Sequence, residues 1–287
     1  MTVSEGEQVR RLLFDTVAVS VLRKVIDAAA SVGVTVAPVK GVVLSRWLYD
    51  DVSDRPYRDL DILIAREDLP RMLAAVHARG WPIEVHSAEM GDLEFTVDRL
   101  MVEIHAEFGR RDLSRLTIAD LLARATVDDR TFPFEVRRID DIDHFLLLVA
   151  NVTKKAFTYA NAHQPADLNR FIERLRPRWG ELIERARAAR FLTALRNVTV
   201  WMAEERGSAP FGELLRTMPA WRRRLLPAVI GWQRRRDRRR PDRLASASGL
   251  FGLVLATQTP DDVRLRGRGL VRLLRRGVAR RLGRDPG

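Results

Sequence analysis

The segment Arg58-Asp-Leu-Asp-Ile-Leu-Ile-Ala65 is the strongest single indicator of fold in this sequence. Its apolar run predicts a strand, in which successive side chains point to opposite faces. Asp59 and Asp61 therefore share one face, while Ile62 and Ile64 point to the other, into a core. Carboxylates side by side repel each other unless a cation lies between them, and Mg²⁺ prefers carboxylate oxygens. The alternative is that both aspartates are only solvated.

Helices and strands alternate around this segment. Apolar spacing, turn residues and helix-ending glycines mark the elements. We expect helices over 8–32, 42–49 and 67–79, and strands over 34–39, 58–65, 81–86, 93–98 and 100–108. This order predicts a mixed α/β (α+β) domain over residues 1–130.

From residue 140 onward the pattern is almost wholly helical. The expected helices cover 140–157, 165–175, 179–205, 211–218, 219–232 and 246–256. We expect an all-helical domain over 131–232 that helps to form an acceptor cleft. An Arg-rich run at 234–243 marks a linker, so residues 233–287 form a separate basic helical tail region.

A third carboxylate is expected on the strand over 100–108. Leu100, Val102 and Ile104 would share its core face, which leaves Glu103 and His105 on the opposite face. A mid-strand ionised glutamate is costly to bury without a cation or donor, although its face can also be solvent-exposed. Two-metal phosphoryl transfer needs such a carboxylate on a neighbouring strand. Competitors for this role are Glu94 and Asp98.

The dipeptide Lys40-Gly41 lies where a predicted strand gives way to a helix. Glycine allows close backbone approach, and a helix start offers free N–H groups to a phosphate. The lysine adds a positive charge for a triphosphate. A Lys-Gly dipeptide alone is a weak motif, and its position ahead of the aspartates is what makes it evidence for a phosphate site.

These residues resemble the uncharacterised nucleotidyltransferase family of the polymerase-beta-like superfamily. The resemblance covers roughly residues 10–200. Its matching features are Lys40-Gly41, Tyr49, Arg55-Pro, Asp59-Leu-Asp61, Glu103-Ile-His105 and, less specifically, Asp167-Leu168. The chain departs from the wider superfamily in having Lys-Gly in place of Gly-Gly or Gly-Ser, and glutamate as the third carboxylate.

The resemblance implies metal-dependent transfer of a nucleotidyl group from an NTP, with ATP as the expected substrate, to an acceptor, releasing pyrophosphate. Asp59, Asp61 and Glu103 would be catalytic and would hold two Mg²⁺ ions. The other implied nucleotide-site residues are Lys40, Gly41, Arg55, Arg58 and His105. The acceptor stays open among a small molecule, a peptide and a nucleic acid.

Several function classes are excluded or disfavoured. The chain has no cysteine, which rules out disulfides, thiolate metal sites and a cysteine nucleophile. It has no P-loop and no dinucleotide Gly-rich fingerprint. The N-terminus lacks a signal-peptide pattern and no apolar run is long enough to span a bilayer, so we expect a cytoplasmic protein.

Positive charge is concentrated at the C-terminal end. Residues 221–287 contain 19 basic and 5 acidic residues, while the preceding 220 carry a balance of −2. This region could contact a polyanion, or could be a solvated tail in an Arg-rich proteome. A non-catalytic module binding nucleic acid or an anionic surface is therefore the alternative function. A third is phosphate or sugar transfer from a nucleotide donor.

Overall fold

The computed structural model describes residues 4–87, 91–107, 114–154 and 163–218. The chain divides into two compact units, which are described separately. One contains Met1–Phe108 with Leu116–His144, and the other contains Gly109–Arg115 with Phe145–Gly287. The boundary falls inside helix α5 (Asp141–Lys154). The predicted helices over 219–232 and 246–256 and the basic tail lie outside the described residues.

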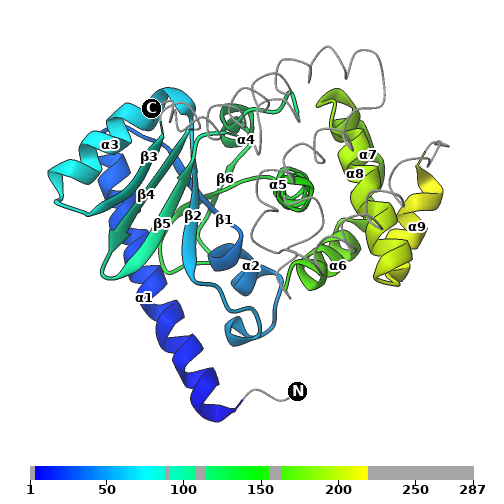
Figure 1. Cartoon of the computed structure of the whole chain (residues 1–287), viewed down its shortest axis with the longest axis horizontal. Coiled ribbons are helices and arrows are strands. Elements are labelled where there is room, and N and C mark those ends of the chain that lie inside the picture. Colours follow the sequence, from blue (N-terminus) through cyan, green and yellow to red (C-terminus); the bar gives the residue numbers. More distant parts are fainter. Residues whose placement is uncertain (1–3, 88–90, 108–113, 155–162, 219–287) are drawn as a thin grey trace, which may run out of the picture. The chain divides into compact units, whose positions relative to one another are not determined.

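The first unit contains a five-stranded mixed sheet (Figure 1). Its strands are β1 (Val36–Val39), β2 (Asp59–Ile64), β3 (Ile83–Ser87), β4 (Asp92–Val97) and β5 (Leu100–His105). They lie in the order β1-β2-β5-β4-β3, and every neighbouring pair is antiparallel except β2 with β5. The predicted mixed α+β class is confirmed. Pro38 is tolerated because β1 is the end strand in this order.

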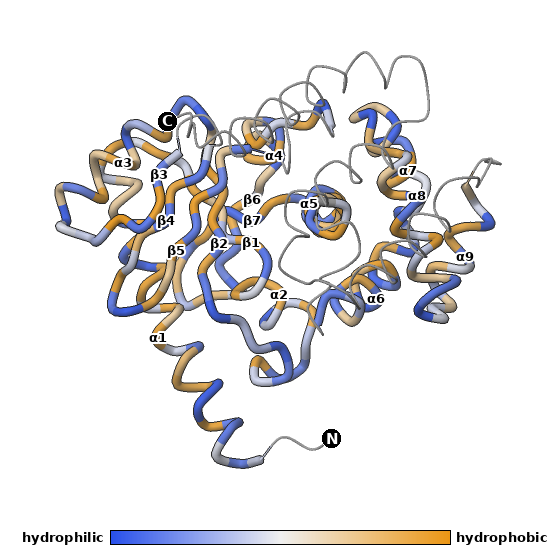
Figure 2. The backbone as a smooth tube through the Cα atoms, in the orientation of Figure 1, coloured by the Kyte–Doolittle hydropathy of each residue, from blue (hydrophilic) through white to orange (hydrophobic). Residues whose placement is uncertain are grey.

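The helices of this unit are α1 (Glu5–Ala30), α2 (Gly41–Trp47), α3 (Leu69–Ala78) and α4 (Ile118–Ala123). Helices α1 and α3 cover one face of the sheet, where their apolar residues join a shared core. Leu60, Ile62 and Ile64 of β2 enter that core and are fully buried. Figure 2 shows hydrophobic positions alternating with hydrophilic ones along the strands. The apolar face of the sheet thus fixes which way its polar face points.

A short hairpin in the first unit has no counterpart in the predicted elements. It consists of β6 (Thr126–Asp128) and β7 (Val136–Arg138). Strands of three residues are too short for a recognisable alternating pattern. A 3-10 turn at Val52–Asp54 and another at Arg66–Asp68 complete the unit.

The second unit is helical in its described part. Beyond α5 it contains α6 (Gln164–Arg174), α7 (Trp179–Ala188), α8 (Leu192–Val200) and α9 (Ala209–Thr217). A 3-10 turn at Arg176–Arg178 leads into α7, and a π turn at Trp201–Glu205 follows α8. The core includes Phe145, which packs on Phe171 and Phe211 with ring centroids 5.7 and 6.3 Å apart.

The single helix expected over 179–205 is wrong. Arg190 adopts a φ of 53°, in the left-handed region, and separates α7 from α8. The apolar spacing continues through this break, so the sequence pattern does not reveal it. Among the described helices, none is both long enough and apolar enough to cross a membrane.

Candidate metal centre

Two adjacent strands bring the acidic side chains together. In the parallel pairing of β2 with β5, Asp61 lies opposite Glu103, and Asp59 lies opposite Met101. Burial along β5 alternates, with Leu100, Val102 and Ile104 buried and the residues between them partly exposed. Glu103 and His105 therefore point away from the core, as the alternation predicts.

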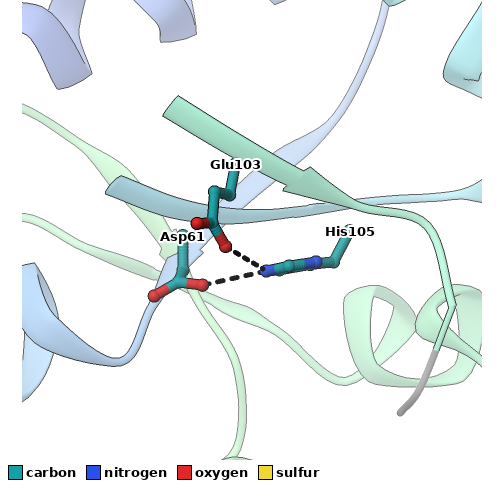
Figure 3. A group of neighbouring side chains, drawn as sticks. All are labelled: Asp61, Glu103 and His105. Carbon is teal, nitrogen blue, oxygen red and sulfur yellow. Dashed lines mark hydrogen bonds and ion pairs between the residues drawn. The ribbon is translucent and has the colours of Figure 1, made fainter. Parts of the chain in front are cut away.

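Asp61, Glu103 and His105 converge at one point, shown in Figure 3. His105 Nε2 lies 2.9 Å from Asp61 Oδ1 and 3.6 Å from Glu103 Oε2. One ligand atom from each residue lies within 4.8 Å of the other two, close enough to share a metal ion. We call these three residues the acidic cluster.

Asp61 is the anionic centre of the acidic cluster. Its side chain is only 7% exposed and bonds to both Lys40 Nζ and His105. Burial alone would raise the pKa of Asp61, but the Lys40 charge and the His105 hydrogen bond outweigh it and hold the pKa well below its ordinary value. Asp61 therefore stays ionised in the metal-free protein.

The pKa values of the two neighbouring carboxylates, Glu103 and Asp59, are shifted in the opposite direction, upward. Burial, followed by the charges of Asp61 and Asp59, raises the pKa of Glu103. Burial and the charge of Asp61 likewise raise the pKa of Asp59. The protein thus concentrates more carboxylate charge than its own cations neutralise here. A divalent cation would relieve that repulsion, so the donors present fit a metal ion.

Lys40 reaches the acidic cluster through an uncommon backbone conformation. It has φ 53° and ψ −125° at the junction of β1 and α2, a region that side-chain-bearing residues rarely occupy. Its Nζ bonds Asp61 and lies 3.3 Å from His105 Nε2. Its backbone N–H donates to His144 Nε2 at 3.1 Å. The ammonium therefore acts as an internal cation of the site.

His144 accepts the hydrogen bond from the Lys40 backbone N–H and is buried. Burial, together with the charges of Arg138 and Lys40, lowers the pKa of His144 to about 3. The imidazole is therefore neutral near neutral pH, and its Nε2 is free of a proton and can accept. Nothing in the sequence pattern marks this contact, since residues 40 and 144 lie on separate elements.

Gly41 is required by packing against Tyr57. A Cβ at this position would lie 2.5 Å from Tyr57 Cβ, closer than real Cβ atoms approach, and 3.1 Å from Arg55 Nη1. Arg55 is close enough for its charge to lower the pKa of Asp59. Arg58, by contrast, is exposed. The triphosphate roles expected for these residues stay predictions.

A second charged cluster lies nearby in the same unit. Arg46 of α2 bonds both carboxylate oxygens of Asp15 on α1, and Tyr57 Oη donates to Asp15 Oδ1 at 2.7 Å. The Arg46 guanidinium also lies over the Phe132 ring. We call Asp15, Arg46 and Tyr57 the anchor cluster, because it ties both helices to the segment leading into β2.

The competing acidic residues are placed differently. Glu94 lies directly opposite Glu103 in the β4–β5 pairing, and so on the same face. Asp98 lies in the following turn and pairs with Lys24, with both side chains about half exposed. Asp92, which sequence reasoning missed, lies opposite His105 and 3.5 Å from its Nδ1. Only the strand register could have revealed it.

Asp167 lies on α6 in the second unit and is buried. Residues 221–287 lie outside the described part of the chain, so the expected polyanion contact stays a prediction.

Comparison with known proteins identifies the family. No curated protein matches the chain. A family model described as an uncharacterised nucleotidyltransferase matches residues 13–206, more than half of the sequence. The match spans the acidic cluster, Lys40 and Asp167, and it confirms the resemblance seen in the sequence. The chain therefore belongs to the uncharacterised nucleotidyltransferase family.

Proposed function

We propose that the chain transfers a nucleotidyl group from an NTP, with ATP as the expected donor, to an acceptor hydroxyl, using two divalent ions. Mg²⁺ is the usual ion for such chemistry. The observation that carries this proposal is the convergence of Asp61, Glu103 and His105 in a chain of this family. The bound ions would polarise the phosphate oxygens and neutralise charge on the leaving pyrophosphate.

The reaction forms one bond and breaks one bond at the α-phosphorus. The acceptor oxygen attacks in line, and the bond from the α-phosphorus to the oxygen bridging it to the β-phosphate breaks. Pyrophosphate leaves with that electron pair, and Glu103 takes the acceptor proton. Glu103 is proposed for this role because it is the carboxylate of the neighbouring strand β5 that lies directly opposite Asp61.

Positively charged groups near the acidic cluster would hold the triphosphate. Lys40 is proposed to exchange Asp61 for phosphate oxygens, and Arg55 and Arg58 to add further charge. The backbone at Gly41 would approach the phosphates, and Asp59 would share the second ion with Asp61. The Lys40 ammonium already lies within bonding distance of Asp61, which supports its assignment to this site.

The experiment supplies each α-labelled NTP with a divalent ion and a cell extract, and identifies what becomes labelled. The Asp61→Asn and Asp59→Asn variants should label nothing while retaining the wild-type circular dichroism spectrum. Asp98→Asn is the matched control, because Asp98 is a half-exposed aspartate in the turn between β4 and β5. Asparagine tolerates its left-handed φ.

Full labelling by both site variants would overturn the proposal. Labelling from an NTP carrying its label on the γ-phosphate, and not on the α-phosphate, would instead indicate phosphate transfer, the third function considered.

We also propose a polyanion contact through residues 221–287, supported by their 19 basic and 5 acidic residues. RNA binding by the full chain should weaken steeply with added salt. Replacing Arg238, Arg239 and Arg240 with glutamate should weaken it further. Salt-dependent RNA binding by a chain that turns over no NTP would favour the non-catalytic alternative.

A further inference from the structure

The His105 ring lies between carboxylates on both sides. Its Nε2 points toward Asp61 and Glu103, as Figure 3 shows. Its Nδ1 lies 3.5 Å from Asp92 Oδ1. The ring is mostly buried, with 23% of the side chain exposed, so these neighbours define its orientation.

Strand register produces this arrangement. Asp92 begins β4 and lies directly opposite His105 at the end of β5, so the two side chains share a face. In this structure Nε2–H donates to the Asp61 carboxylate, and a metal ion would take the place of that proton. A carboxylate that accepts from Nδ1–H keeps the ring oriented so that Nε2 would then face the ion. The same carboxylate–imidazole arrangement orients histidine ligands in metalloproteins. Asp92 thus supplies an observation that is independent of the three residues of the acidic cluster.

We propose that His105 is a direct metal ligand through Nε2, oriented by Asp92, and that the ion held by Asp61, Glu103 and His105 is a transition-metal dication rather than Mg²⁺. The inference rests on the proposed function, because it concerns one of the two ions that the transfer would use. The other ion, shared by Asp59, Asp61 and the triphosphate, would have only oxygen ligands and remain Mg²⁺.

The donor set gives the chemical reason. Mg²⁺ binds almost entirely through oxygen, whereas imidazole nitrogen favours first-row transition metals. Two carboxylate oxygens and one nitrogen within 4.8 Å of one another therefore discriminate against Mg²⁺. The ion would replace the Lys40 ammonium at Asp61, releasing that cation toward the phosphates.

The test uses Mn²⁺ as the probe and the full chain. Electron spin-echo spectroscopy of bound Mn²⁺ should show modulation from one imidazole nitrogen. His105→Gln should abolish that modulation and lower the ratio of Mn²⁺ to Mg²⁺ affinity by about tenfold or more. His77→Gln, at an exposed histidine on α3, should keep both properties. Asp92→Asn should weaken Mn²⁺ binding by about 10- to 100-fold.

Absence of nitrogen modulation in the wild-type protein, or an unchanged affinity ratio in His105→Gln, would overturn the inference. If His105→Gln does not fold, unchanged Mn²⁺ affinity in Asp92→Asn overturns it instead. NTP transfer without the nitrogen signal would refute this inference alone. The nitrogen signal without transfer of any NTP would support it and refute the proposed function.

Discussion

Two partly buried charged clusters in the described part of the first unit differ in how well their charges are balanced. In the anchor cluster one carboxylate, Asp15, receives two bonds from Arg46 and one from Tyr57. The charge of Asp15 is balanced by Arg46 and its oxygens accept hydrogen bonds, so the anchor cluster needs no bound ion. Such a network fixes the relative positions of helices.

The acidic cluster carries surplus negative charge. Lys40 and His105 bond to Asp61, but the pKa values of Glu103 and of Asp59, which lies beside the cluster on β2, remain raised. Burial and mutual repulsion cause those shifts, and the structure tolerates them at a cost in stability. The comparison teaches that buried charge serves structure where it is balanced, and favours ligand binding where it is not.

The largest expected effect is on the rate of nucleotidyl transfer, and it follows from a substitution in the acidic cluster. Glu103→Gln should reduce nucleotidyl transfer by at least about a thousandfold, because loss of a metal ligand removes several kcal/mol of transition-state stabilisation. Its free energy of unfolding without metal should equal or exceed that of the wild type, since a repelled carboxylate is removed. Transfer rates and urea unfolding measure both. A less stable variant with normal transfer would contradict the comparison.

In the anchor cluster, by contrast, a substitution should lower the stability of the fold. Arg46→Met leaves Asp15 buried with one remaining donor, and should lower the free energy of unfolding by about 3–5 kcal/mol. The control Arg23→Met breaks an exposed pair with Asp27 and should cost less than about 1 kcal/mol. Urea unfolding curves test this difference. Equal losses in the two variants would show that the anchor cluster is not structural.

His144 should make stability depend on pH on the acidic side. Its pKa is about 3 in the folded chain, below its ordinary value. In mildly acidic solution the unfolded chain therefore binds a proton at this histidine, and the folded chain does not. Stability from this group is complete above about pH 6.5 and is lost as pH falls toward about 3. Between about pH 7.5 and 5 the loss should be about 2 kcal/mol.

His144→Gln should remove that part of the pH dependence while keeping an acceptor for the Lys40 N–H. His77→Gln, at an exposed position, is the control and should keep the wild-type slope. Unfolding free energies at the two pH values decide the matter. Parallel pH dependence in His144→Gln and the wild type would refute the prediction.

The smallest expected effect concerns the internal cation. Lys40→Met should tighten Mn²⁺ binding by roughly tenfold, because the ion no longer displaces an ammonium from Asp61. The same variant should bind NTP more weakly. Calorimetric titration measures both affinities. Weaker Mn²⁺ binding in Lys40→Met would show that the ammonium supports the metal site and does not compete for it.

Sequence alone predicted the strands of the sheet because β4 and β5 alternate between buried and partly exposed residues and β1 and β2 are short apolar runs. Asp59, Asp61, Glu103 and His105 were assigned to one face by a periodicity that the apolar core enforces. The break at Arg190 was missed because the apolar spacing runs through it.

The candidate site was less predictable than the sheet. Asp92 joins it only through strand register, and His144 only through its hydrogen bond with the Lys40 backbone. Such contacts join residues far apart in the chain, and no local pattern encodes them. The anchor cluster was missed for the same reason, since it connects three separate segments.

The parallel pairing of β2 with β5 has a consequence for how the protein matures. These two neighbours are separated along the chain by α3 and the strands β3 and β4, so residues 65–99 must be placed before Asp61 meets Glu103. Closing such a long segment is slow compared with forming a hairpin. A nascent chain released only as far as β2 lacks Glu103 and His105, so the proposed metal binding would have to follow completion of the sheet.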